Sequence, residues 1–122
     1  MNWVLVGAVS GFLGVALGAF GAHGLPKDTP PQALEWWKTA AQYHLVHALA
    51  LLLTGLAGLQ GVRVDVAGWC FLAGTAIFSG TLYAMTLGAP RILGAVTPIG
   101  GVLLLAGWVA LAFAARSLAG RL

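Results

Sequence analysis

The sequence predicts an all-α integral membrane protein, a four-helix bundle with up-down topology and short loops. Its 122 residues are 60% hydrophobic and only 7% charged, whereas soluble domains carry about 25% charged residues. The few charges leave four uncharged stretches, at 1–26, 39–62, 66–90 and 92–115. Each stretch exceeds the roughly 20 residues that a helix needs to cross about 30 Å of hydrocarbon. We therefore predict a single transmembrane domain over residues 1–122.

The first predicted helix, 2–22, carries a stripe of glycines along one face. These are Gly7, Gly11, Gly14, Gly18 and Gly21. Inside lipid, small residues let two helix backbones approach closely, and the helix survives its glycines because no water competes for its hydrogen bonds. We expect this helix-packing face to meet a helix of its own chain or of a second copy. A cleaved signal peptide is disfavoured, because no Lys or Arg precedes the apolar run.

The second predicted helix crosses the membrane over 39–60 and begins earlier, near residue 30, at the membrane interface. Thr29 and Gln32 have the spacing of a capping box, which would make Pro30 the first helical residue. We expect these first turns to lie at the interface, with Trp36 and Trp37 as an aromatic anchor.

The last two predicted helices span 67–87 and 96–115. The connection 61–65 is short, so the helices on either side of it should be antiparallel neighbours. Before the last helix the sequence is ambiguous. Residues 92–96 form either a loop that dips into the interface or an early helical turn that is kinked at Pro98, and we favour the loop.

The charge pattern limits the partners of the protein. The net charge of +3 is too small and too scattered for a nucleic-acid surface, which leaves the lipid bilayer and a homo-oligomer or membrane-protein partner. Cationic residues divide equally between the two sides: Arg63, Arg116 and Arg121 on one, Lys27, Lys38 and Arg91 on the other. The positive-inside rule therefore decides nothing; the terminal amine and the C-terminal arginines favour cytoplasmic termini.

Most polar side chains capable of chemistry are expected on the side of the first and third loops. The candidate cluster consists of His23, Tyr43, His44, His47, Ser79, Tyr83 and Thr97. Helical spacing places Tyr43, His44 and His47 on one face. Three histidines are enough to ligate a transition metal and can relay protons. Such residues equally serve as hydrogen-bond partners between membrane helices, so the metal and the cofactor stay unknown.

We find no arrangement that predicts an enzyme. No buried carboxylate is available to pair with a base, no serine has a nucleophile-elbow context, and the glycines of the first helix lack a P-loop lysine. We predict a non-enzymatic scaffold or accessory membrane protein whose polar end docks a partner. The alternative is a small transporter, a proton pathway or a metal- or haem-binding protein that uses the His/Tyr cluster.

Three stretches together carry a family resemblance: "LGAFGAHGL" (17–25), "WKTAAQYHLVHALALLL" (37–53) and "FSGTLYAMTL…TPIGGVLLLAGW" (78–108). The sequence resembles the small four-span membrane proteins of domain of unknown function 423, which are related to eukaryotic transmembrane protein 256. The resemblance implies an integral protein of the bacterial cytoplasmic membrane and no established activity or cofactor. The matching motif positions are Gly18, Gly21, His23, Gly24, Tyr43, His47, Ser79, Gly80, Tyr83, Pro98, Gly100 and Gly101.

Overall fold

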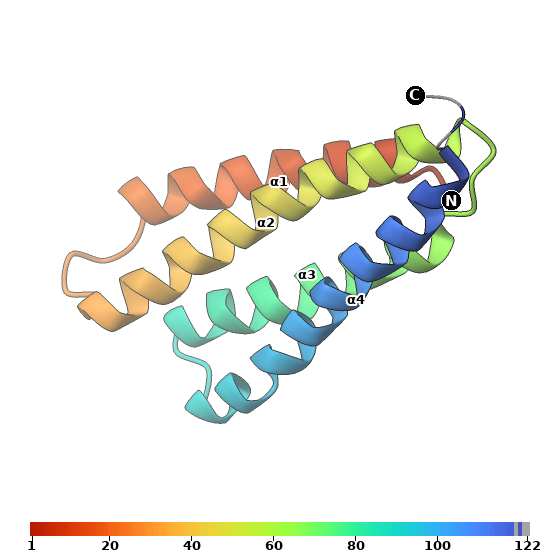
Figure 1. Ribbon diagram of the computed structural model, residues 1–122. Coiled ribbons are helices and arrows are strands. Elements are labelled where there is room, and N and C mark those ends of the chain that lie inside the picture. Colours follow the sequence, from red (N-terminus) through yellow and green to blue (C-terminus); the bar gives the residue numbers. More distant parts are fainter. Residues whose placement is uncertain (119, 121–122) are drawn as a thin grey trace.

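The computed structural model describes residues 1–118 and 120, and within them the chain forms four long helices. Their bounds are α1 (Trp3–His23), α2 (Pro31–Gly58), α3 (Asp65–Thr86) and α4 (Thr97–Ala115). All four are long and apolar enough to cross a membrane, and the described residues contain no strand. The start of α1 and the end of α4 lie at one end with the α2–α3 connection, and the other two connections lie at the opposite end (Figure 1). The predicted all-α, up-down bundle is therefore confirmed.

The start of α2 differs from the predicted capping box. Pro30 is the N-cap residue and Pro31 opens the helix, with no side-chain cap. The Thr29 hydroxyl turns back and donates to the carbonyl of Pro26 at 2.6 Å, so it is not available to the helix. The fixed φ of proline stabilises the first turn, where the missing N–H has no partner to lose.

The segment before α4 is neither of the two alternatives that the sequence left open. It forms a separate 3₁₀ helix, η1 (Arg91–Ala95), and Val96 separates it from α4. The favoured loop is therefore wrong. A second 3₁₀ turn, η2 (Arg116–Leu118), follows α4, and Arg121, which entered the charge count, lies outside the described residues.

The glycine face of α1 packs against α2 of the same chain, but unevenly along its length. A Cβ added at Gly7 would lie 2.7 Å from a backbone nitrogen of α2, and one at Gly14 would lie 2.8 Å from a leucine side chain there. A Cβ at Gly21 would fall on a tryptophan ring of α2. At Gly11 it would make an ordinary contact at 3.8 Å, and at Gly18 it would meet nothing. Helix α1 therefore approaches α2 most closely at every seventh residue, at Gly7, Gly14 and Gly21.

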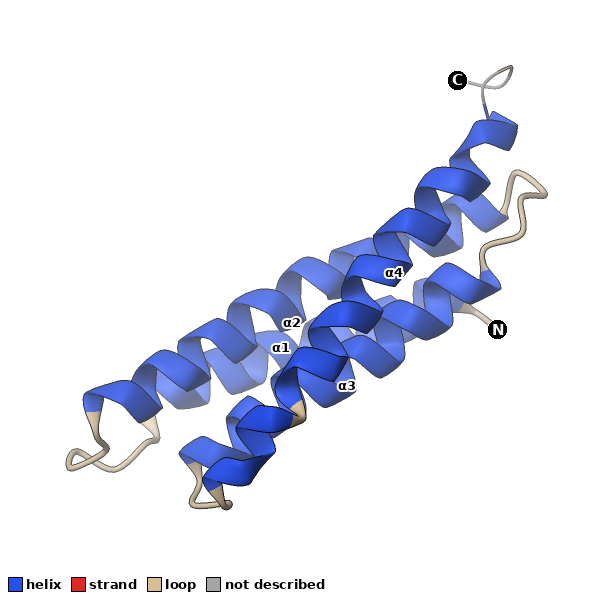
Figure 2. Ribbon diagram, turned by 60° about the horizontal axis from the view of Figure 1, so that its bottom comes forward, coloured by secondary structure: helices blue, strands red, loops and turns tan. Residues whose placement is uncertain are grey.

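Helices α3 and α4 form a second hairpin held together in the same way. A Cβ at Gly100 would fall on the backbone of Phe78, and one at Gly74 would lie 2.9 Å from the backbone nitrogen of Leu104. The two hairpins run along a common direction, with loops at their ends (Figure 2). The molecule is therefore two glycine-packed hairpins side by side.

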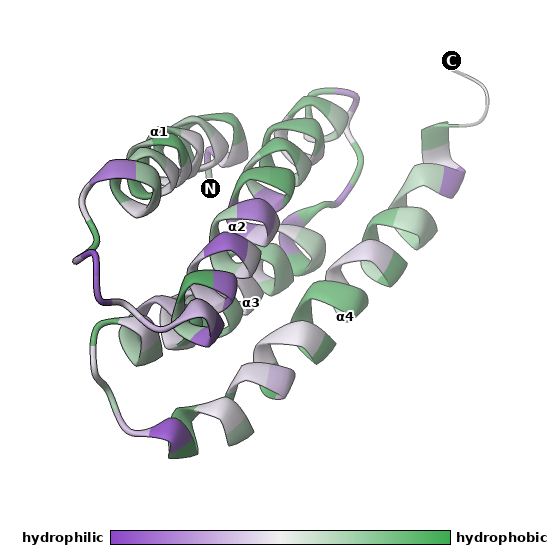
Figure 3. Cartoon of the chain, turned by 90° about the vertical axis from the view of Figure 1, so that its left-hand side faces the viewer, coloured by the Kyte–Doolittle hydropathy of each residue, from purple (hydrophilic) through white to green (hydrophobic). Residues whose placement is uncertain are grey.

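Helices α2 and α3 lie between α1 and α4 (Figure 3), and neighbours in the sequence are neighbours in space. The larger hydrophobic core lies toward the end that holds the α2–α3 connection, around Trp3, Leu51 and Phe71. The mean hydropathy over an 18-residue stretch is 2.0 in each of the two outer membrane spans and 1.3 in each of the two inner ones. The less apolar helices are therefore those with neighbours on two sides.

The unequal packing of the glycine face generates a test within one helix. Gly7→Ala should lower the free energy of unfolding by about 1–3 kcal/mol, because the added methyl group meets backbone that cannot move aside. Gly18→Ala, the matched control, should change it by less than about 0.5 kcal/mol. Both values are measured by denaturant titration of purified protein in detergent. Equal losses for the two variants would contradict the packing described above.

Candidate functional site

The seam between α2 and α3 is held by hydroxyl groups that donate to backbone carbonyls of the facing helix. The hydroxyl of Ser79 donates to the carbonyl of Ala40 at 2.8 Å. Seven residues further along α3, Thr86 donates to the carbonyl of Ala33 at 3.0 Å. The equal spacing on both helices shows that the same two faces meet at both points. In the predicted cluster, Ser79 is therefore a link between the two hairpins.

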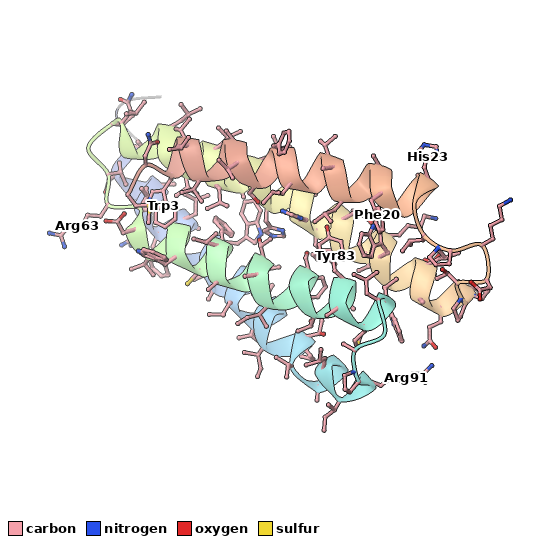
Figure 4. All side chains as sticks on the ribbon, turned by 180° about the vertical axis from the view of Figure 1, so that it is seen from behind. Trp3, Phe20, His23, Arg63, Tyr83 and Arg91 are labelled. Atoms are coloured by element: carbon pink, nitrogen blue, oxygen red, sulfur yellow. The ribbon has the colours of Figure 1, made fainter. Side chains whose placement is uncertain are left out.

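His44 lies at the middle of α2 and faces Tyr83 of α3. The Nδ1 atom of His44 is 3.0 Å from the Tyr83 hydroxyl, and the ring lines the same cleft as Ser10 of α1. Either the ring or the hydroxyl can be the donor, because this depends on which ring nitrogen carries the proton. Figure 4 shows Tyr83 pointing from α3 toward the first hairpin. His44 therefore joins α2 to α3 through Nδ1.

His47, one turn further along α2, is bonded through both ring nitrogens. Its Nδ1 lies 2.8 Å from the carbonyl of Tyr43, and its Nε2 accepts a hydrogen bond from the Trp108 indole at 3.0 Å. The rings of Phe71 and Trp108 pack against it, with centroids 5.7 Å away in each case. The imidazole is therefore a neutral ring with its proton on Nδ1, buried among aromatic groups.

Tyr43 of α2 and Thr97 of α4 also belong to the predicted cluster. Tyr43 is 42% exposed; it supplies its carbonyl to His47 and packs its ring on Phe78 at 4.6 Å. The Thr97 hydroxyl lies 2.6 Å from that of Thr81, which joins α4 to α3. Thr97 is the first residue of α4 and does not cap it.

The structure does not bring the three histidines together. His23 is exposed at the end of α1 (Figure 4), away from the bundle interior. His44 and His47 are three residues apart, which separates their directions by about 60° on a helix. The two rings therefore face different helices: His44 is bonded to Tyr83 of α3, and His47 is bonded to Trp108 of α4. Among the described residues no group of three His, Cys, Asp or Glu side chains could hold a metal ion.

Sequence reasoning missed two residues of this network. Trp108 is the hydrogen-bond donor to His47, and Thr81 is the partner of Thr97. A signal for Trp108 was present, since an indole N–H within an apolar helix requires an acceptor and few acceptors exist at that depth. Thr81 gave none, because a threonine on a membrane helix satisfies its own hydroxyl at the carbonyl four residues earlier.

Comparison with known proteins places the chain in a family. Residues 17–101 match the family model described as "Protein of unknown function (DUF423)". The chain belongs to this family. The match covers the network described above except for Trp108 and the N-terminal half of α1.

Similar proteins are bacterial and are named as membrane proteins. The chain is 42% identical to a UPF0382 membrane protein of Staphylococcus epidermidis over 119 residues, 97% of this chain and 98% of the relative. It is 42% identical to the UPF0382 membrane protein YwdK of Bacillus subtilis over 93% of this chain and 94% of that one. A relative from Haemophilus influenzae is 42% identical over 87% of this chain and 86% of its own length. No solved structure matches.

These findings confirm an integral membrane protein of bacterial type. Helical bundles belong to the cytoplasmic membrane, because outer-membrane spans are strands of closed barrels. The family is one of unknown function, so the chemistry of the site has to be argued from its geometry.

The His47–Trp108 contact generates a quantitative prediction. In a double-mutant cycle with His47→Leu and Trp108→Phe, the coupling energy should be about 0.6 kcal/mol and no more than about 1.7 kcal/mol, as for other hydrogen bonds between membrane helices. The cycle is measured from unfolding free energies in detergent. A coupling near zero would show that the bond does not form in the folded protein.

Proposed function

We propose that the protein is a non-enzymatic membrane protein that works by binding, as a scaffold or accessory subunit. The observation that carries this proposal is the state of His47, whose two ring nitrogens both make hydrogen bonds inside the bundle. A nitrogen engaged in this way can neither ligate a metal nor accept a proton unless the contact with Trp108 is broken. His44 is bonded to Tyr83 through Nδ1, which supports a structural role for this residue as well.

The acidic residues add to this argument. Asp65 accepts a hydrogen bond from the Trp3 indole at 2.9 Å, at the opposite end of α3 from Tyr83. Glu35 is exposed and lies 3.9 Å from Lys38, and Asp28 is exposed in the first loop. General acid–base chemistry requires a carboxylate or another titratable group within hydrogen-bond reach of the reacting atoms. The described residues offer no carboxylate next to either buried histidine.

The end of the bundle with the first and third loops is the part that would meet a partner. Lys27, Lys38 and Arg91 are exposed there. Arg91 donates to the Gln32 side chain at 3.2 Å and lies 5.6 Å from the centroid of the Trp36 ring. These contacts tie the two hairpins together and support a rigid polar end, which suits docking of another membrane protein or a second copy.

The proposal is tested by comparing His47→Gln with His23→Gln. The amide keeps one donor and one acceptor at the buried position, and the exposed histidine provides the matched control. Purified wild-type protein should carry no stoichiometric metal by elemental analysis and no haem by absorption spectroscopy. In proteoliposomes it should give no proton flux above that of empty vesicles. His47→Gln should lower the thermal unfolding temperature, and His23→Gln should leave it unchanged.

Two results would overturn the proposal. The first is one metal ion or haem per chain that is lost in His47→Gln while the variant stays folded. The second is a pH-driven flux that this variant abolishes. Either result would favour the alternative use of the histidines as a cofactor or proton site.

A further inference from the structure

A cleft of about 520 Å³ opens between α1 and α3, and α2 forms its floor at His44. Its walls are apolar, with Leu5, Val9 and Leu13 on one side and Leu72 and Ala76 on the other. It follows α1 from residue 5 to residue 17, a length of about 18 Å at 1.5 Å per residue. Sites for small molecules have this size and this apolar lining, with a few polar groups.

The cleft is lined by small residues at positions where a larger side chain would fit. Gly80 lines the cleft, and a Cβ added there would meet no atom within 4 Å. Ala76, one turn away on the same helix, is another small residue of that wall. By contrast, Gly7 and Gly100 sit where a Cβ would strike backbone. Gly80 therefore keeps a cleft open and does not serve helix contact.

Thr75, at the middle of α3, lines the same cleft and has a hydroxyl without a partner. It is 7% exposed, and its oxygen is the one buried side-chain polar atom among the described residues that makes no hydrogen bond. The four other threonines with buried or half-buried hydroxyl bonds all donate to the carbonyl four residues earlier: Thr54, Thr81, Thr86 and Thr97. A buried hydroxyl without a partner lowers the stability of the folded protein. In a helix, threonine has two accessible χ1 rotamers, which place the hydroxyl in two different directions.

We propose that the cleft binds one uncharged, lipophilic molecule whose carbonyl oxygen accepts a hydrogen bond from Thr75. The inference rests on the proposed function, because it names what a protein that works by binding would hold. No charged residue lines the cleft, so a charged group would lose its hydration without compensation. The covered Thr75 hydroxyl has no hydrogen-bond partner in the protein, and a ligand carbonyl would provide one once a change of χ1 turns the hydroxyl toward the cleft.

The depth of Thr75 narrows the chemical class. The residue lies midway between the ends of α3, near the centre of a hydrocarbon layer about 30 Å thick. The ester carbonyls of phospholipids lie with the headgroups and do not reach this depth. A membrane-soluble carbonyl compound does, and isoprenoid quinones are of this kind. Among the polar side chains of the cleft, His44 and Tyr83 are bonded to each other and Ser79 is bonded to α2. The buried Thr75 hydroxyl, by contrast, has no partner.

The hydrogen bond is tested with Thr75→Val, which keeps the shape of the side chain and removes the hydroxyl. The probe is a naphthoquinone with a short isoprenoid tail, added to protein in nanodiscs of zwitterionic phospholipid. Native mass spectrometry counts the adducts. Wild type should bind one probe per chain, and Thr75→Val should bind it about three- to tenfold more weakly, the loss expected for one hydrogen bond. Thr54→Val, which removes a hydroxyl outside the cleft, should bind like wild type.

The location is tested with Gly80→Leu, which should fill the cleft and abolish binding. Gly18→Leu is the matched control, because a Cβ also meets nothing there and Gly18 lies outside the cleft. Binding that survives Gly80→Leu overturns the location. Equal binding of a hydrocarbon analogue without carbonyl groups, together with an unchanged Thr75→Val, overturns the proposed hydrogen bond and shows that an acyl chain fills the cleft. Neither outcome alters the metal and flux results that test the proposed function.

Discussion

The close approach of helix backbones is the interaction on which this fold depends. Helices in a bilayer gain nothing by hiding apolar surface from one another, since lipid tails are equally apolar. Contacts such as Gly7 against α2 and Gly100 against the backbone of Phe78 bring the helices near enough for dispersion forces to act over many atoms. Each hairpin has one such contact surface. The glycine stripe that looks unfavourable for a helix in water is therefore what defines the hairpins.

The junction between the hairpins relies on polar side chains instead. Ser79 and Thr86 donate to carbonyls of α2, and His44 and His47 reach α3 and α4 respectively. This division explains the hydropathy difference, because the two inner helices hold the polar groups and the two outer helices face lipid. Each of these hydroxyl groups donates to one particular carbonyl of the facing helix, so these contacts also fix the register of α2 against α3.

The sequence was sufficient for the fold class and insufficient for the site, and the reason is physical. Uncharged stretches determine where helices cross, and that depends on each segment alone. Which glycines make contact depends on the partner surface, so Gly7 and Gly18 look alike in the stripe and differ in the bundle. The direction of His44 and His47 depended on the position of α3, which their spacing does not encode. Trp108 was missed for the same reason: its acceptor lies on a helix distant in the sequence.

Residue type alone therefore says little about chemistry inside this membrane protein. His44 and His47 look reactive in the sequence and are engaged in the bundle, while Thr75 looks ordinary and has the hydroxyl without a partner. The two side chains are identical, but Thr81 has a hydroxyl of the neighbouring helix α4 as a partner, and Thr75 has none. In a bundle with few polar groups, almost all of them stabilise the fold. A binding role then depends on the Thr75 hydroxyl, which makes no hydrogen bond within the protein, and on the cleft that lies beside it.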